Sequence, residues 1–300
     1  MRLIALALAL LASTAPLHAE ERTTLGFGRI FHNDFFGDGQ DRWRTGGYTF
    51  SIVRGPEWQG RAPARPGAIL EYRLKTEIIS PDATAAPGTD RPYVGSLTAG
   101  LHSHWTSGAF DISAGGDLMF IGPSTGVSDF HEGFHDFLSM PKPVGPATQL
   151  GDATHFGLTG EMSRQITTGE QTTLRPFIEV QAGIETLARV GADFIWGSVG
   201  PDDLLLRDSV TGQLYRGTQR EGFGFSGIFG VDVAQVADSV YLPSDRGFVE
   251  EETRYRLRAG VHSQMGERIS WFYGLTYLSE EYEGQPKGQT LGSLKLNFNF

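Results

Sequence analysis

The chain has 300 residues and a formal net charge of −10, from 25 basic and 35 acidic side chains. This balance argues against a nucleic-acid-binding protein, because phosphate backbones are held by clusters of Lys and Arg. Cysteine is absent, which excludes disulfides and thiol chemistry. Forty Gly, twenty Phe, nine Tyr and five Trp favour a β protein with aromatic girdles.

The N-terminus has the pattern of a secretory signal peptide. A basic start at Arg2 precedes an apolar run from Leu3 to Ala12, and the small residue Ala19 closes the segment. We expect cleavage after Ala19, so that residues 1–19 are the signal peptide and residues 20–300 form one domain. No later apolar run approaches the ~20 residues that a transmembrane helix needs. The mature chain therefore either floats free or crosses a membrane as strands.

Alternating hydrophobicity predicts an all-β fold, an antiparallel transmembrane β-barrel. Along residues 254–261, apolar side chains alternate with three arginines, which suits one face toward lipid and one toward a wet lumen. The closing strand alternates in the same way and ends on Phe300. Twelve strands are predicted, an even number as in single-chain bacterial barrels; their approximate ranges are 23–33, 45–54, 68–79, 92–104, 109–121, 154–166, 171–184, 187–199, 220–233, 252–264, 270–281 and 288–300.

Two segments do not fit this alternation. In the first strand Arg29 is in phase with Leu25 and Phe27, so its two faces stay unassigned. The connection 201–219 is long and contains a leucine run and a Thr211-Gly212 turn. An additional hairpin there would raise the count to fourteen strands.

Strand parity places the connections 34–44, 80–91 and 122–153 at one mouth. This mouth is extracellular if both termini face the periplasm, as in bacterial barrels. The third connection contains a stretch that predicts a short amphipathic helix, with Ser128 as a capping residue. Its apolar residues have helical spacing, and we expect them to pack on the barrel rim: Phe130, Phe134, Phe137 and Leu138.

Motifs at this mouth resemble those of a known family. Asn33-Asp34 follows the first strand and Thr45 enters the second; residues 90–93 (Asp-Arg-Pro-Tyr) open the fourth, and residues 121–123 (Ile-Gly-Pro) precede His135 by about a dozen positions. This order and spacing resemble the outer-membrane lipid A 3′-O-deacylase family (LpxR type). The resemblance covers essentially the whole mature chain.

The resemblance implies a protein inserted into the bacterial outer membrane by the barrel-assembly machinery. It implies hydrolysis of the ester-linked acyl chains at the 3′ position of lipid A in lipopolysaccharide, with a divalent cation that is calcium in the characterised case. His135 matches the catalytic histidine, and Asn33, Asp34 and Thr45 match the other active-site positions. The sequence departs from the family at Pro141, where the family has a Glu, and at position 131, where a His replaces an amide.

The residue types alone, without the family resemblance, are also compatible with ester hydrolysis. Ester hydrolysis needs a base that titrates near neutrality, and His135 is such a base. It also needs donors or positive charge where the oxyanion forms, and a cation or the Asn33 amide provides them. A hard cation needs oxygen ligands, for which Asp34 is suitable. We therefore predict direct attack by a water that His135 activates, without an acyl-enzyme.

Further residues are candidates for supporting roles. We expect a neighbouring acid, Asp136 or Glu132, to replace the missing Glu, and His131, Asp41, Arg42 and Arg91 are further candidates for support. Each also has a plain structural interpretation. Asn33-Asp34 suits an ordinary turn, the charged residues suit a solvated rim, and His131 with His135 suits either a metal pair or a helix surface without a ligand.

Three other functions compete with the lipid A hydrolase. An arginine-rich lumen also suits a narrow channel, although twelve strands leave little interior space. An outer-membrane phospholipase is a second alternative, but no serine with a histidine beside it is apparent. The third is a catalytically inactive relative that binds glycolipid.

Overall fold

The computed structural model describes residues 22–300 except 86–89, 144, 219–221, 267–268 and 299–300. The expected signal peptide, residues 1–19, and the C-terminal Phe300 therefore lie outside the described residues. None of the described helices is long and apolar enough to span a bilayer.

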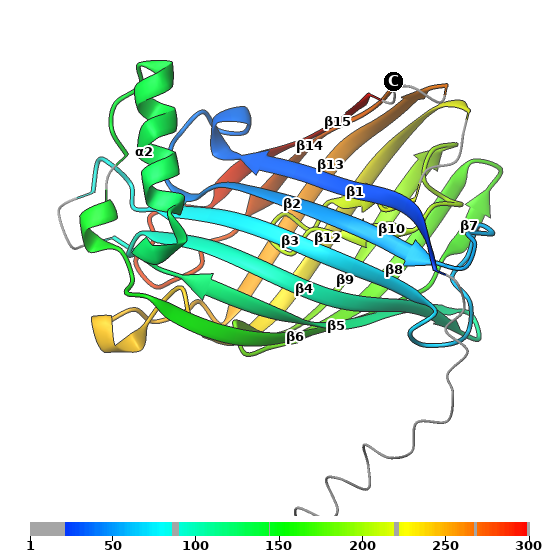
Figure 1. Ribbon diagram of the computed structural model, residues 1–300, viewed down its shortest axis with the longest axis horizontal. Coiled ribbons are helices and arrows are strands. Elements are labelled where there is room, and N and C mark those ends of the chain that lie inside the picture. Colours follow the sequence, from blue (N-terminus) through cyan, green and yellow to red (C-terminus); the bar gives the residue numbers. More distant parts are fainter. Residues whose placement is uncertain (1–21, 86–89, 144, 219–221, 267–268, 299–300) are drawn as a thin grey trace, which may run out of the picture.

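Twelve antiparallel strands close into a barrel, as the alternation predicts (Figure 1). The wall closes where β1 pairs with β15 and where β6 pairs with β8, and the short β7 extends the β6 edge along β8. The twelve wall strands are β1 (Thr23–Asn33), β2 (Trp43–Gly55), β3 (Ile69–Ser80), β4 (Val94–Ser107), β5 (Phe110–Ile121), β6 (Ala153–Ser163), β8 (Thr172–Ala182), β9 (Glu185–Gly197), β12 (Phe223–Ser239), β13 (Thr253–Met265), β14 (Ile269–Leu278) and β15 (Gln289–Phe298), and the short β7 is Ile166–Gly169.

The two faces of the wall follow the predicted alternation. On β13, Tyr255 and Leu257 are exposed, whereas Arg254, Arg256 and Arg258 are buried. The buried arginines pair with acids on neighbouring strands; one example is the 3.0 Å contact between Arg256 and Asp232. Buried arginine is tolerated because each charge faces a carboxylate.

The lumen contains a hairpin that does not belong to the wall. β10 (Leu205–Arg207) and β11 (Leu214–Arg216) pair only with each other. Leu206 and Tyr215 pack against Ile30 and Phe272 of the wall, forming an apolar core inside the barrel. Arg207 anchors the hairpin through ion pairs with wall acids on β6 and β9. The extra hairpin is therefore present, but the fourteen-strand alternative is wrong.

This hairpin explains the mixed pattern of the first strand. Ile30 is fully buried on the lumen side because the apolar hairpin, and not water, lies against it. A Cβ at Gly28 would lie 2.8 Å from the Tyr215 ring, so the close approach of the hairpin requires glycine there. Arg29 lies over the Phe50 ring, with 5.8 Å between the guanidinium carbon and the ring centroid.

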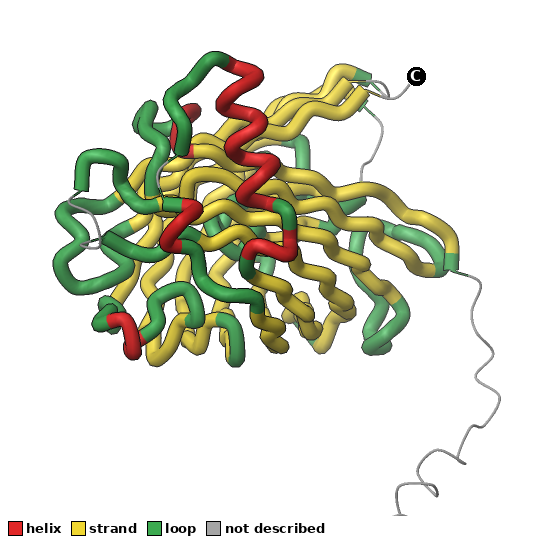
Figure 2. The backbone as a smooth tube through the Cα atoms, turned by 60° about the vertical axis from the view of Figure 1, so that its left-hand side comes forward, coloured by secondary structure: helices red, strands yellow, loops and turns green. Residues whose placement is uncertain are grey.

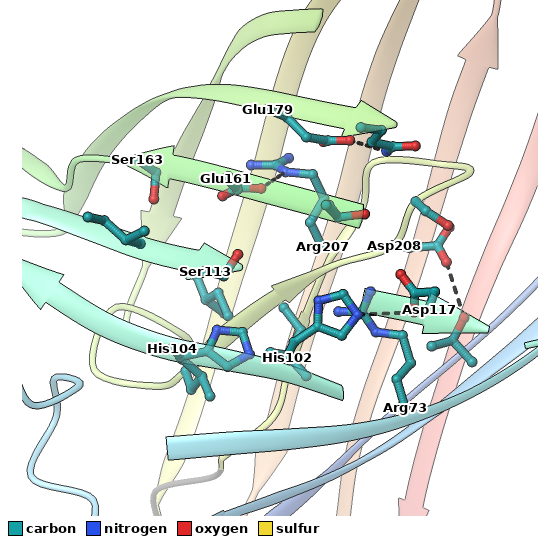
Figure 3. A pocket seen from close by; sticks show the side chains of 18 of the residues that line it. Arg73, His102, His104, Ser113, Asp117, Glu161, Ser163, Glu179, Arg207 and Asp208 are labelled. Carbon is teal, nitrogen blue, oxygen red and sulfur yellow. Dashed lines mark hydrogen bonds and ion pairs between the residues drawn. The ribbon is translucent and has the colours of Figure 1, made fainter. Parts of the chain in front are cut away.

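Elsewhere in the lumen, buried polar side chains surround a pocket, and several of them pair with one another (Figure 3). His102 forms a hydrogen bond with Asp117 at 3.0 Å, which Figure 3 marks. His104 forms one with Glu71 at 2.9 Å. Towards one mouth, buried Arg44 contacts Glu77 at 2.5 Å. The hairpin and these ion pairs cross-link the lumen, and a pocket lined by residues such as His102, Asp117 and Arg207 remains beside the hairpin.

All the described helices gather at one mouth of the barrel, while turns and the longer connection 56–68 lie at the other (Figures 1 and 2). They are η1 (Asp34–Phe36), η2 (Pro123–Thr125), α2 (Val127–Leu138), η3 (Pro146–Thr148) and η4 (Ser244–Arg246). We call this end the helical mouth.

The orientation of α2 differs from the prediction. Phe130, Phe134, Phe137 and Leu138 are exposed, Phe137 by 82%, and the buried face consists of Val127, Ser128, His131 and His135. The reason is the close seating of the helix start, where a Cβ on Gly95 would come within 2.8 Å of the Val127 Cβ. Ser128 is not a cap, because α2 begins at Val127 with Gly126 at the N-cap.

Candidate active site at the helical mouth

The end of β1 provides a buried carboxylate. Asn33 Oδ1 accepts the Phe35 N–H at 2.8 Å and caps η1, so the turn interpretation of this residue is correct. Asp34 is 1% exposed and accepts the Arg42 backbone N–H at 2.8 Å and the Thr45 hydroxyl at 3.2 Å. Burial raises the pKa of Asp34 to about 8. Among the described residues no basic side chain forms an ion pair with Asp34.

A β-bulge positions Thr45. The pairing of β2 with β3 shifts between Arg44 and Gly46, so Thr45 is the extra residue of the bulge. Bulges of this kind redirect side chains and are frequent beside active sites. The Thr45 hydroxyl lies 2.6 Å from Asp41 Oδ1 as well as beside Asp34. It therefore links two carboxylates from the 34–44 connection.

Two histidines of α2 face the same carboxylate. His135 Nε2 lies 3.4 Å from Asp41 Oδ2, and His131 Nε2 lies 3.7 Å from Asp41 Oδ1. Both residues are 4% exposed, so the two histidines lie on the buried face of the helix and not on its solvent-exposed surface. Burial opposes the ionisation of Asp41, but His131 and Thr45 outweigh it and lower the pKa of this carboxyl.

The Nδ1 atom of each of these two histidines also has a hydrogen-bonding partner. His135 Nδ1 lies 2.5 Å from the carbonyl oxygen of Pro141, and the Tyr93 hydroxyl lies 3.2 Å from His131 Nδ1. A carbonyl only accepts hydrogen bonds, so the proton of neutral His135 is on Nδ1 and its Nε2 lone pair is free. The expectation that Asp136 or Glu132 supports His135 is wrong: in the described part of the chain neither bonds to it, and the Pro141 carbonyl takes that place.

Arg42 and Arg91 anchor the surrounding loops. The Arg42 guanidinium pairs with Asp82 at 2.9 Å and lies over the Trp43 ring, and Arg91 pairs with buried Glu281. Both arginines are less than 10% exposed, so they are not solvated rim charges. Their role is to hold the connections that carry Asp34, Asp41 and Tyr93.

Three contributions escaped the sequence analysis. Tyr93 was part of a motif but had no assigned role, and a backbone carbonyl such as that of Pro141 leaves no signal in side-chain patterns. Gln289 Nε2 donates to the Arg42 carbonyl at 2.6 Å and lies 3.5 Å from Asp34. The sequence did offer one signal for Gln289: it stands at the start of the closing strand, which pairs with the end of β1.

The family described as Outer membrane protein LpxR matches residues 4–300. The chain belongs to the LpxR family. Its structure is similar to that of LpxR from Salmonella typhimurium, with a TM-score of 0.75 and 17% sequence identity over 92% of this chain and 100% of that chain. The LpxR resemblance and the LpxR-like barrel are thus confirmed, and the family places the protein in the bacterial outer membrane.

Two further solved barrels are less similar to this chain than the Salmonella protein is. The β domain of the Bordetella autotransporter BrkA has a TM-score of 0.49 and 12% identity, over 92% of this chain and 99% of that chain. The NanC porin has a TM-score of 0.44 and 7% identity, over 92% and 100%. Neither bears on function. No curated protein matches the sequence.

Proposed function

We propose that the protein is a hydrolase that removes ester-linked acyl chains from the 3′ position of lipid A, with its active site at the extracellular side of the outer membrane. One observation carries this proposal. Residues 33–45, Tyr93 and the buried face of α2 are distant in sequence, yet they converge around the His135 imidazole at the helical mouth. Membership of the LpxR family supports lipopolysaccharide as the substrate.

His135 is the base in this reaction. The Pro141 carbonyl holds the Nδ1 proton, so Nε2 accepts a proton from water as the water oxygen attacks the ester carbonyl carbon. Asp41, 3.4 Å from Nε2, stabilises the imidazolium that forms. When the tetrahedral intermediate collapses, the same proton passes to the departing sugar oxygen. The products are a free fatty acid and a sugar hydroxyl.

The Asn33 side chain is suited to stabilise the oxyanion. Its Oδ1 is occupied by the Phe35 N–H, and its Nδ2 lies beside Gly46 of β2, where an added Cβ would be 3.0 Å away. Nδ2 has no hydrogen-bond partner among the residues that the structure describes. A fixed amide donor at a developing negative charge is a common source of catalytic stabilisation.

The reaction depends on a divalent cation, calcium in this proposal. The oxygens of Asp34, Asp41 and Thr45 lie together and are the donors that a hard cation prefers. Asp34 is also buried without an opposite charge, which a cation would provide. When bound, calcium would supply positive charge for the oxyanion. The barrel-assembly machinery remains the expected partner for membrane insertion.

The test is mass spectrometry of lipid A from an outer-membrane host with intact lipid A that expresses the full chain. We expect loss of the 3′-linked acyl group, abolished by His135→Ala and by a chelator. The matched control is His155→Ala, which changes a partly exposed histidine on β6 and leaves cleavage intact. Unchanged lipid A with bound glycolipid would identify an inactive binding protein, and loss of phospholipid chains would identify a phospholipase.

A further inference from the structure

Helix α2 carries a motif with metal-binding spacing, and the proposed hydrolysis uses only its second histidine, His135. Residues 131–135 read His-Glu-Gly-Phe-His, the H-E-x-x-H spacing that puts two imidazoles on one face of a helix, as in zinc hydrolases. The spacing alone occurs by chance. Here both histidines are buried on the face that packs against the barrel rim, while the phenylalanines of the same helix point away.

Asp41 completes a set of three ligands. One ligand atom each from Asp41, His131 and His135 lie within 4.8 Å of one another, and His135 Nε2 lies 3.4 Å from Asp41 Oδ2. Ligands that bind Zn²⁺ at about 2.0–2.2 Å in a tetrahedron are about 3.3 Å apart. We propose that Asp41, His131 and His135 bind a zinc-class transition-metal ion through one carboxylate oxygen and two Nε2 atoms, which leaves a fourth position open.

The second nitrogen of each imidazole supports this assignment. Histidines that bind metals usually engage the other ring nitrogen with a carbonyl, carboxylate or hydroxyl group, which aims the ligating nitrogen. The Pro141 carbonyl does this for His135 at 2.5 Å, and the Tyr93 hydroxyl lies 3.2 Å from Nδ1 of His131. Both Nε2 atoms are consequently directed at Asp41, which is the arrangement of a preformed site.

The donor set selects a different ion from the calcium of the proposed reaction. Two imidazoles with one carboxylate suit Zn²⁺, Co²⁺ or Ni²⁺, whereas calcium takes oxygen ligands only. Asp41 belongs to both sets of ligands, because its Oδ1 also accepts a hydrogen bond from the Thr45 hydroxyl, which lies beside Asp34. The helical mouth thus has an oxygen-rich set and a nitrogen-rich set that share one carboxylate.

A consequence follows for activity, and it rests on the proposed function. A transition-metal ion at this site takes the Nε2 lone pair of His135, which the proposed hydrolysis needs for proton transfer. The two uses of His135 exclude each other. Zinc-class ions are therefore inhibitors that act at the base itself, and His131 is the residue that gives this chain its sensitivity to them.

The site is tested by titrating the full barrel, folded in detergent micelles and free of other metals, with Co²⁺ and recording visible absorption. We expect one equivalent of Co²⁺ to give the intense band of a four-coordinate ion, and Zn²⁺ to displace it. His131→Gln weakens binding by more than about 100-fold, since even outer-shell partners are worth about 10- to 100-fold. His155→Gln is the matched control and keeps the wild-type band. Absence of the band, or its persistence in His131→Gln, overturns the site.

A second measurement separates the metal site from the proposed function. Lipid A hydrolysis with calcium present is measured at increasing Zn²⁺, for the wild type and for His131→Gln. We expect the residual activity of the variant to tolerate at least about 10-fold more Zn²⁺. Equal sensitivity, or activation by Zn²⁺, overturns the inhibition. A chain that binds Co²⁺ but leaves lipid A intact disproves the hydrolase and retains the metal site.

Discussion

His135 Nδ1 lies 2.5 Å from the carbonyl oxygen of Pro141. This position is the one at which the family resemblance implied a glutamate. A carbonyl fixes the same tautomer that a carboxylate would fix, but it carries no charge. The side chain at position 141 is consequently dispensable for orienting His135, while the course of the backbone is not.

This contact gives a prediction for two substitutions. His135→Asn keeps a donor near the Pro141 carbonyl but lacks an atom equivalent to Nε2, so we expect hydrolysis to fall about 100- to 10,000-fold. Pro141→Ala keeps the carbonyl, and we expect a change of less than about 10-fold. Release of the 3′ acyl chain from purified lipopolysaccharide measures both. Comparable losses in the two variants would show that the proline ring, and not its carbonyl, matters.

Thr45 provides the second prediction, because its hydroxyl bridges Asp34 and Asp41. Thr45→Val preserves the shape but leaves two carboxylates facing a methyl group, an uncompensated loss worth about 1–3 kcal/mol. We expect activity to fall about 10- to 100-fold and more calcium to be required for half-maximal activity. Thr45→Ser retains the hydroxyl and is the control. An unchanged calcium requirement in Thr45→Val would remove Thr45 from the cation set.

The sequence predicted the wall of this protein better than its interior. Alternation along β13 depends only on lipid outside and charge inside, so Tyr255 and Arg256 could be assigned from their order. Ile30 could not be assigned, because its partner is the hairpin residue Tyr215, about 185 positions away. In the site, Asp34, Thr45 and His135 were found through the family pattern.

The face of α2 shows the limit of periodicity. Helical spacing showed that Phe130, Phe134 and Phe137 share a side, and it could not show which side packs on the rim. The glycine at position 95 decides this by seating Val127, and that contact joins residues of different elements. In a membrane protein an apolar face can be the outer one, so the usual assumption that it faces a core fails here.

The natural absence of cysteine makes this orientation measurable. A nitroxide label on Phe137→Cys should be mobile, because the native side chain is 82% exposed, whereas a label on Ser128→Cys should be immobilised against the barrel. The line shapes of electron paramagnetic resonance spectra in detergent report this difference directly. An immobile label at position 137 would mean that α2 is rotated about its axis from the orientation described here.

The hairpin in the lumen leads to a prediction about permeability. Leu206 and Tyr215 pack on the wall and Arg207 is held by ion pairs with Glu161 and Asp193, so the intact protein should show no conductance steps in planar bilayers. Replacing residues 205–216 by a short Gly/Ser linker should open a small conductance, provided that circular dichroism shows an intact barrel. Steady conductance of the intact protein would instead favour the channel function.

The last prediction concerns stability against acid. Burial opposes the charge of Glu281, but Arg44 and Arg91 outweigh it and hold the pKa of Glu281 well below its usual value. A depressed folded-state pKa stabilises the protein above the unfolded-state pKa of about 4.3, and this contribution is lost as the pH falls through the folded-state pKa. Glu281→Gln should therefore cost about 3 kcal/mol at pH 7.

The same substitution should flatten the pH dependence. Urea unfolding in micelles at pH 7 and at steps below pH 4.3 gives the free energy of unfolding of each variant. The wild type should lose stability over this range more steeply than Glu281→Gln, so that their difference shrinks as the pH falls. Glu283→Gln, which changes an exposed acid in the same connection, is the matched control and should follow the wild type. A difference that stays constant with pH would show that Glu281 acts through packing and not through its charge.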